Sequence, residues 1–187
     1  MNKVKVIICP GNGCNNIRNA NWYGQFHDEL TSRGITSVCQ TFPDPYVARR
    51  SLWLPFIESL GTDTNTILVG HSSGAQAALR YAETHELKAI VLVSATYSDL
   101  GDAGERASGY YPQGETNLYD FEAMKRNVGI IHQFHSDTDP FIPLKEAEQI
   151  RDGLGIDDKG YHMLKGRSHF FDSFPELMDV IESIIKG

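Results

Sequence analysis

The sequence predicts an α/β domain in which a mostly parallel sheet is covered by helices on both faces. Short β-branched apolar runs alternate with longer amphipathic stretches along the 187 residues, and this alternation requires the crossover connections that build parallel sheets. The hydrophobic fraction of 41% is close to that of ordinary globular chains. Because no repeat, low-complexity segment or linker divides the sequence, residues 1–187 are expected to form one domain.

The first half of the chain supplies four expected strands, which are the β-branched runs at residues 4–9, 36–42, 66–69 and 88–94. Helical periodicity predicts the elements between them, at residues 21–32, at 47–60 and in the alanine-rich stretch after residue 74. Gly34 follows the first helix as a stop signal, and Pro55 is expected to kink or break the second.

The second half begins with the longest non-periodic segment, residues 95–116, which is polar, glycine-rich and bears several tyrosines. No regular element is expected there. Beyond it, helices are expected at 117–126, 143–154 and 175–186, and strands at 129–135 and 160–164. The prediction is therefore a three-layer sandwich with a six-stranded sheet, which would bind ligands at the carboxyl ends of its strands.

Charge and composition argue against several classes of partner. A formal net charge of −7 is unsuited to nucleic acid, which requires a basic face, and offers no attraction to anionic membranes. The three cysteines lack a Cys-x-x-Cys spacing and indicate neither a disulfide framework nor a zinc site. The N-terminal apolar run is too short for a signal peptide, and no run approaches the ~20 apolar residues of a spanning helix. A cytoplasmic protein is expected.

A Gly-x-Ser-x-Gly motif, Gly-His-Ser-Ser-Gly at residues 70–74, lies between the third strand and the following helix. In the α/β-hydrolase fold such a motif forms a tight turn that exposes a nucleophilic serine. The turn brings the residues two before and two after the serine almost into contact, and glycine fits there because it lacks a Cβ. Gly70 and Gly74 have this spacing around Ser72 but not around Ser73. A plain glycine-rich turn is the alternative, but the strand and helix on either side favour a nucleophile and a minimal α/β-hydrolase fold.

An acid and a base are expected after the serine, in that order along the chain. Asp137 and Asp139 compete for the acid. The sequence Asp-Pro-Phe-Ile-Pro, which opens the next helix, favours Asp139. Among seven histidines, His169 lies in a loop between the last strand and the last helix, at the carboxyl edge of the sheet. It is therefore the expected base.

These residues suit acyl transfer by the Ser-His-Asp mechanism. His169 would take the proton of Ser72 during attack, and Asp139 would fix the imidazole tautomer. The negative charge on the carbonyl oxygen requires preorganised donors. The expected donors are the backbone N–H groups of Ser73, in the turn, and Asn12, in the loop after the first strand.

Neither a metal nor a cofactor is expected. His132, His135, Asp137 and Asp139 contain metal-ligand chemistry, but residues 132 and 135 point to opposite faces of a strand. The glycine-rich loop at 10–13 departs from the dinucleotide fingerprint because Asn16 occupies the place of its third glycine.

Aromatic residues supply candidates for the substrate pocket, which segment 95–116 would partly roof. Trp22, Tyr97, Tyr110, Tyr111 and Phe141 could line it or pack in the core. The sequence leaves the two alternatives open.

The chain resembles the retinoblastoma-binding-protein-nine family of small serine hydrolases through motifs spread nearly end to end. They include Pro10-Gly11-Asn12-Gly13, Pro43-Asp44-Pro45, Trp53-Leu54-Pro55-Phe56, Gly70-His71-Ser72-Ser73-Gly74-Ala75, Glu105-Arg106-Ala107-Ser108-Gly109-Tyr110 and Asp139-Pro140-Phe141. The resemblance implies a minimal α/β-hydrolase with six parallel strands, little lid, and a triad at Ser72, Asp139 and His169. The family's namesake member carries a Leu-x-Cys-x-Glu peptide, but residues 60–64 here are Leu-Gly-Thr-Asp-Thr. A retinoblastoma-type pocket-protein partner is therefore not expected.

The sequence leads to two functional hypotheses. The first is a serine hydrolase that cleaves a small ester or amide through an acyl-enzyme intermediate. The second is a non-catalytic or weakly catalytic protein-interaction module on the same fold, because a fold alone does not determine function. Labelling of Ser72 by an acyl- or phosphonyl-transfer reagent would distinguish them.

Overall fold

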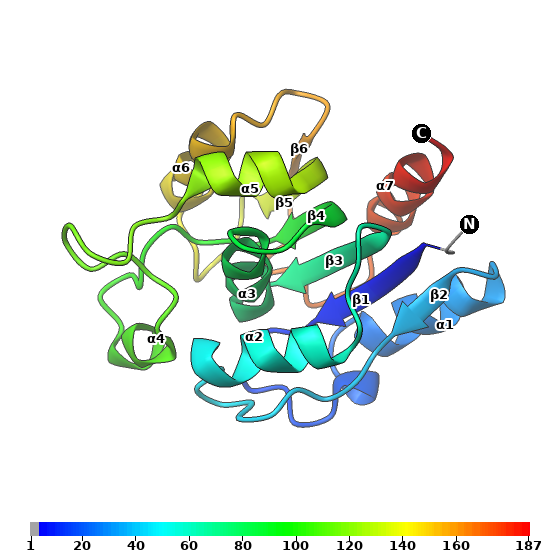
Figure 1. Ribbon diagram of the computed structural model, residues 1–187, viewed down its shortest axis with the longest axis horizontal. Helices are drawn as coiled ribbons and strands as arrows, with labels where there is room; N and C mark the ends of the chain where they lie inside the picture. Colours follow the sequence, from blue (N-terminus) through cyan, green and yellow to red (C-terminus); the bar gives the residue numbers. More distant parts are fainter. Residues whose placement is uncertain (1–3) are drawn as a thin grey trace.

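The computed structural model describes residues 4–187, which form a three-layer α/β structure around a six-stranded parallel sheet (Figure 1). Residues 1–3 of the expected domain lie outside this range. The strands are β1 (Lys5–Cys9), β2 (Thr36–Val38), β3 (Thr66–His71), β4 (Leu87–Val93), β5 (Val128–Ser136) and β6 (Tyr161–Leu164). Their order across the sheet is β2-β1-β3-β4-β5-β6. The chain therefore reverses direction across the sheet at β1 and β3, where such folds bind ligands.

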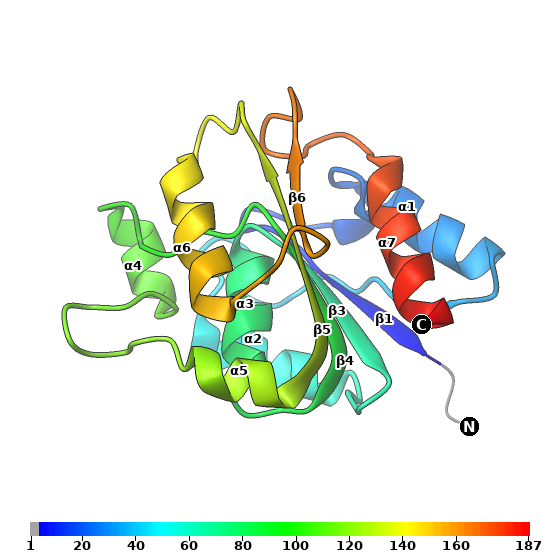
Figure 2. The ribbon, with the colours of Figure 1, turned by 90° about the horizontal axis from the view of Figure 1, so that it is seen from above.

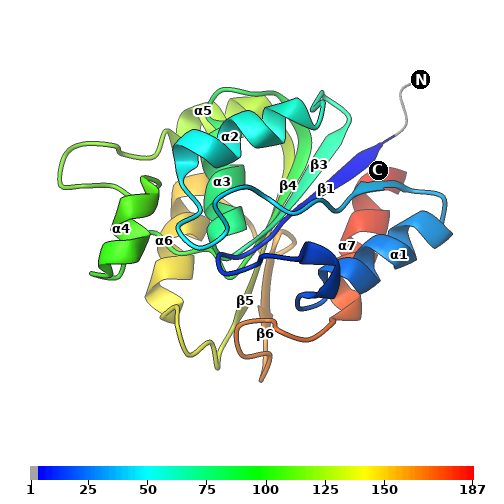
Figure 3. The ribbon, with the colours of Figure 1, turned by 90° about the horizontal axis from the view of Figure 1, so that it is seen from below.

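Helices cover both faces of the sheet, as predicted (Figure 2). One face carries α1 (Tyr23–Ser32) and α7 (Pro175–Lys186), and the other carries α2 (Arg50–Ser59), α3 (Ser73–Ala82), α5 (Phe121–Asn127) and α6 (Leu144–Leu154). The short helix α4 (Ala103–Ser108) lies outside this second layer, away from the sheet (Figure 3). Within residues 4–187, none of the helices combines the length and the apolar character needed to cross a bilayer.

The two faces of the sheet have separate hydrophobic cores. In β1, Val6 and Ile8 pack into the core beneath α1 and α7, whereas Ile7 and Cys9 pack into the core beneath α3. All four are fully buried. This division follows from the alternation of side chains along a strand, and it explains why the strands are apolar runs without a polar face.

Besides α5, which begins at Phe121 rather than at residue 117, three elements differ from the sequence prediction. Strand β2 ends at Val38, well before residue 42. Helix α2 begins at Arg50 rather than 47, because Ala48 has a φ of 58° and cannot be right-handed helix, and it continues through Pro55 without a break. The third difference is α4, within the segment expected to be irregular. Asp102 caps its first turn by accepting from the N–H of Glu105, which is a recognisable helix-start signal.

The remainder of that irregular segment is fixed to α3 by a buried arginine. Arg80 is 2% exposed. Its guanidinium donates to the carbonyl oxygens of Tyr110, Asn117 and Leu118, with Nε–O of 2.7 Å at Tyr110 and Nη1–O of 3.0 Å at Leu118. Carbonyl groups that are removed from water need hydrogen-bond donors. Here the Arg80 side chain supplies the donors that backbone N–H groups supply in a strand or helix.

Candidate active site

Ser72 occupies a strained turn between β3 and α3. Its backbone has φ 54° and ψ −119°, a conformation that is sterically unfavourable for a residue with a Cβ and that is found mainly at functional sites. The N–H of Ser72 donates to the carbonyl oxygen of Val93 in the neighbouring strand at 2.9 Å. Helix α3 begins at the next residue, so the serine lies at the carboxyl edge of the sheet.

The two glycines around Ser72 are required by close backbone contacts. A Cβ on Gly70 would collide with the carbonyl oxygen of Gly74, and a Cβ on Gly74 would collide with that of Cys9. Neither obstacle is a flexible side chain, so the turn could not accept alanine at either position without moving β1 or α3. The spacing predicted from the sequence therefore has a steric cause.

His169 and Asp139 form a buried pair at the same edge of the sheet. Nδ1 of His169 lies 2.8 Å from Oδ2 of Asp139 and 3.1 Å from Oδ1. The N–H groups of Phe141 and Ile142 also donate to Oδ1, at 3.0 and 3.1 Å. Burial alone would raise the pKa of Asp139, but the hydrogen bonds from His169 and the two amides outweigh it, so the pKa lies below its ordinary value. The carboxylate is therefore ionised at neutral pH.

Asp137, the competing acid, has a different contact. Its Oδ1 accepts from the backbone N–H of Gly166 at 2.8 Å. Asp137 thus holds the start of the loop that carries His169, while Asp139 contacts the imidazole itself.

Ser94 is a further contact of the acid that the sequence analysis did not identify. Its hydroxyl donates to Oδ2 of Asp139 at 2.8 Å. Ser94 is fully buried at the end of β4 and has a φ of 51°. A serine after a strand carries no recognisable signal, since its partner lies 45 residues away along the chain.

Ser72 and His169 line one cavity of about 410 Å³. Because Nδ1 of His169 is engaged by Asp139, Nε2 is the nitrogen left for a hydroxyl. Among the hydrogen bonds of residues 4–187, none joins Ser72 Oγ to His169. Catalytic hydrogen bonds are often long in unliganded enzymes and tighten when substrate binds.

The loop after β1 lies directly beside the serine, since a Cβ on Gly11 would be 3.4 Å from Cβ of Ser72. Two of its amides are already engaged. The N–H of Gly11 donates to Tyr23 Oη at 2.9 Å, and that of Gly13 donates to the carbonyl oxygen of Pro45 at 2.6 Å. Pro10 has no N–H, which leaves the N–H of Asn12 as the loop's available donor. Ser73 is the first residue of α3, where N–H groups lack an intrahelical acceptor.

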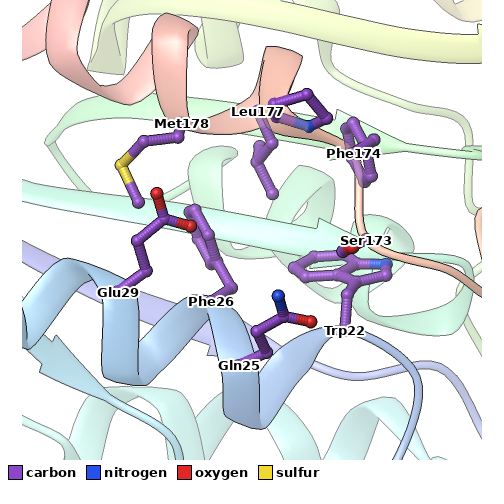
Figure 4. Close-up of a pocket in the computed structure, with 9 residues that line it drawn as sticks. Trp22, Gln25, Phe26, Glu29, Ser173, Phe174, Leu177 and Met178 are labelled. Carbon is purple, nitrogen blue, oxygen red and sulfur yellow. The ribbon is translucent and has the colours of Figure 1, made fainter.

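The aromatic candidates divide between the cavity and the core. Phe141 and Tyr111 line the cavity around Ser72. Trp22, Tyr97 and Tyr110 do not, so the possible pocket lining is wrong for these three residues and the alternative, packing elsewhere, holds. Tyr110 is fully buried in the core on the α3 side, and Tyr97 packs against the same core. Trp22 lines a separate groove of about 130 Å³ between α1 and α7, beside Phe174 (Figure 4).

Two carboxylates fix the polar wall of the cavity. Oε2 of Glu146 accepts from the N–H of Ser98 at 2.7 Å and from the hydroxyl of Thr96 at 3.1 Å, and both donors line the cavity. Glu105 accepts from Asn12 Nδ2 at 3.0 Å and from Tyr111 Oη at 2.6 Å. These contacts hold the segment after β4, and α4, in place over the serine.

The rival histidine–aspartate cluster is divided among different contacts. Nδ1 of His132 pairs with Nε2 of His162 at 2.9 Å, and Asp139 pairs with His169. Across residues 4–187, no group of three or more His, Cys, Asp or Glu side chains could hold a metal ion.

The sequence matches a known protein family over most of its length. Residues 6–179 match the model described as the alpha/beta hydrolase family, and the chain belongs to this family. The narrower resemblance is confirmed as well. The chain is 44% identical over 184 residues to Serine hydrolase RBBP9 of Rattus norvegicus, an alignment that covers 97% of this chain and 95% of that protein.

Solved structures share the whole fold. The ydeN gene product of B. subtilis has a TM-score of 0.85 and 20% identity, covering 99% of this chain and 100% of its own. The monoacylglycerol lipase of Paleococcus ferrophilus has a TM-score of 0.65 and 18% identity, covering 97% and 94%. At these identities the likeness is one of fold alone.

Proposed function

We propose that this protein is a serine hydrolase that cleaves small esters or amides, with Ser72 as nucleophile, His169 as base and Asp139 as acid. One observation carries the proposal: a serine in a strained strand–helix turn and a histidine held by a buried carboxylate line the same cavity. Each feature alone has structural explanations, but their convergence on one space fits the requirements of nucleophilic catalysis. The name of the 44% identical relative, a serine hydrolase, supports the same class of reaction.

In the proposed mechanism, Nε2 of His169 takes the hydroxyl proton as Ser72 Oγ attacks the acyl carbon. The N–H groups of Asn12 and Ser73 stabilise the negative charge on the carbonyl oxygen. The imidazolium then gives its proton to the leaving alcohol or amine, which departs and leaves an acyl-serine. Water then attacks the acyl carbon while His169 takes one of its protons. The acid departs as the bond to Ser72 Oγ breaks, and the imidazolium returns its proton to Oγ, which regenerates the free serine. Throughout, Asp139 stays ionised and holds the imidazole by Nδ1.

The cavity wall indicates the kind of substrate. Leu100, Phe141, Ile142 and Phe171 form an apolar side, and Leu100, Phe141 and Phe171 are 42%, 59% and 44% exposed at its mouth. A volume of about 410 Å³ is at the small end of ligand sites. A short apolar acyl or alcohol group of the substrate would pack against these side chains and remove them from contact with water.

A fluorophosphonate probe tests the proposal. We expect covalent labelling of the wild-type protein, none of Ser72→Ala, and greatly slowed labelling of His169→Ala. Ser183→Ala is the matched control, because its hydroxyl bonds only to Val180 within α7. Absence of labelling in the folded wild-type protein, or equal labelling of Ser72→Ala, would contradict the proposal and favour an interaction module.

A further inference from the structure

We infer that Tyr23 is a positioning residue for catalysis, acting through His71 to fix the oxyanion loop, the serine turn and the histidine loop relative to one another. The inference rests on the proposed function, because it assigns a role within that active site. Tyr23 does not line the cavity around Ser72, so its role is indirect.

The connection is a continuous line of buried hydrogen bonds. Tyr23, the first residue of α1, is 0% exposed. Its Oη lies 2.6 Å from Nδ1 of His71, the residue immediately before the nucleophile. Nε2 of His71 lies 2.8 Å from the backbone carbonyl oxygen of His169. One imidazole thus bridges the phenol of α1 and the backbone of the histidine loop.

The direction of every hydrogen bond in this line is determined. A carbonyl oxygen only accepts, so Nε2 of His71 carries the proton and Nδ1 of the neutral ring is an acceptor. Tyr23 therefore donates its hydroxyl proton to Nδ1. Its two lone pairs accept from the N–H of Gly11 at 2.9 Å and from Nδ2 of Asn21 at 3.1 Å. The phenol is fully satisfied in a single arrangement.

The environment keeps His71 neutral, as this arrangement requires. Burial, with a smaller contribution from the charge of the neighbouring His169, lowers the pKa of His71 to about 3. A protonated His71 would direct a second N–H at Tyr23 Oη, whose lone pairs are already taken. It would also place a positive charge beside His169 when that ring becomes an imidazolium. The neutral ring avoids both costs.

The histidine loop needs such external support because its own backbone is strained. Ser168 and Phe170, on either side of His169, have φ values of 50° and 53°, which are sterically unfavourable for residues other than glycine. Two consecutive carbonyls of the loop are held from outside. His71 donates to that of His169, and Nε1 of Trp22 donates to that of Phe170 at 2.9 Å. Figure 4 shows the Trp22 ring beside Ser173 and Phe174, where the loop enters α7.

Tyr23 is the one group in this line that contacts both the oxyanion loop and the residue beside the nucleophile. Removing its hydroxyl leaves the N–H of Gly11 and Nδ1 of His71 without this partner. Asn12 and His169 would then sample wider positions, and errors of about 1 Å cost on the order of 100-fold in rate. The loss falls mainly on kcat, since the apolar side of the cavity, formed by Leu100, Phe141, Ile142 and Phe171, is unchanged.

The test compares Tyr23→Phe with Tyr81→Phe. Tyr81 is the matched control, because it lies in the core on the α3 side of the sheet, away from the line of hydrogen bonds. Its hydroxyl forms a hydrogen bond with Thr62 Oγ1 at 2.5 Å. We expect Tyr23→Phe to lower kcat for a p-nitrophenyl ester about 10- to 100-fold, with KM changed less than about twofold. Tyr81→Phe, which removes one hydrogen bond rather than three, should retain activity. Equal kcat for Tyr23→Phe and wild type, or equal losses in both variants, would overturn the inference.

Substitution of His71 separates hydrogen bonding from packing. The amide of His71→Gln offers both a donor and an acceptor, whereas His71→Leu offers neither. We expect His71→Gln to recover most of the kcat that His71→Leu loses. Equal activities in these two variants would contradict the inference.

A spectroscopic readout distinguishes a failure of the inference from a failure of the proposed function. ¹⁵N NMR of the His71 ring should show the proton on Nε2 in the wild-type protein and a changed Nδ1 resonance in Tyr23→Phe. A proton on Nδ1 would overturn the line of hydrogen bonds. If wild-type protein failed to react with a fluorophosphonate while this signature was present, the proposed function would fail and the hydrogen-bond line would stand.

Discussion

The hydroxyl of Ser94 donates to Oδ2 of Asp139 at 2.8 Å, the same oxygen that lies 2.8 Å from Nδ1 of His169. Two donors from different segments therefore converge on one buried carboxylate oxygen. Ser94 helps to stabilise the negative charge that orients the imidazole, although the sequence places it 45 residues from Asp139.

Ser94→Ala should reduce both stability and turnover. A hydrogen bond to a buried charged group contributes about 1.5–3 kcal/mol, and its loss leaves the carboxylate, and with it the imidazole of His169, less firmly oriented. We expect a fall of that size in the free energy of unfolding and roughly a tenfold fall in kcat/KM for a p-nitrophenyl ester. Urea titration and steady-state kinetics would measure the two effects. Ser183→Ala is the control, and unchanged kcat/KM in Ser94→Ala would show that the contact does not assist the base.

Gly70→Ala should destabilise the protein far more than alanine at an unobstructed glycine. The new Cβ would meet the carbonyl oxygen of Gly74, so backbone must move, at an expected cost above about 3 kcal/mol. Gly155 provides the comparison, because it has a φ of 65° but nothing within 4 Å of an added Cβ. Gly155→Ala should cost only about 1–2 kcal/mol, from backbone strain. Similar losses for both variants in thermal or urea unfolding would contradict the steric account of the turn.

Acid should weaken the fold through His71. Its pKa is lowered from 6.5 to about 3, chiefly by burial. Between these values the unfolded chain binds a proton that the folded chain excludes, so the free energy of unfolding falls by about 1.4 kcal/mol per unit of decreasing pH. His71→Gln lacks this dependence. The stability difference between wild type and His71→Gln should therefore shrink by about 2 kcal/mol from pH 6.5 to pH 5.

Parallel urea titrations at the two pH values would measure this change. His132, His135 and His162 also have lowered pKa values because of burial, and they add to the slope of both proteins equally. A constant difference between the proteins would mean that folding leaves the pKa of His71 unchanged.

Phe171 should determine how well the enzyme uses longer acyl chains. It lies at the mouth of the cavity, 44% exposed, so Phe171→Ala removes apolar contact surface without opening the core. Burying a methylene contributes about 0.8 kcal/mol. We expect the kcat/KM ratio of p-nitrophenyl butyrate to acetate to fall about three- to tenfold. Leu52→Ala, at an exposed position on α2, is the control, and an unchanged ratio in Phe171→Ala would remove Phe171 from the substrate site.

The parts of the site that were predictable from sequence depend on local geometry or on chain order. The turn at Ser72 needs glycines at fixed spacing, so its motif is visible in a few residues. Asp139 and His169 could be chosen because parallel strands bring their carboxyl-end loops to one edge. The strand and helix pattern likewise predicted the order of layers, since β-branched runs and amphipathic stretches have different periods.

The unpredictable parts depend on contacts between distant segments. Tyr110 faces the core, and its carbonyl is tied to Arg80, a contact that no local pattern encodes. Trp22 and Tyr23 are adjacent, yet both side chains hold other segments rather than line the cavity. The late start of α2, at Arg50 rather than at residue 47, follows from the left-handed backbone of Ala48. Alanine rarely adopts this conformation, so the sequence gives no sign of it.

Arg80 gives α3 a second structural role, and this role affects how substitutions in the helix could change the activity of the protein. Ser72, the proposed nucleophile, precedes the first turn of that helix. Two turns later, the Arg80 guanidinium binds the carbonyl oxygen of Tyr110, next to Tyr111 in the cavity wall. A displacement of α3 would therefore move Ser72 and this part of the cavity wall together, and the space between them would be preserved. A larger side chain at Ala77 or Ala78, both buried where α3 packs against its neighbours, should displace the helix. Turnover should then change, because the distance between Ser72 and His169 changes, while the preference among acyl chains should stay the same.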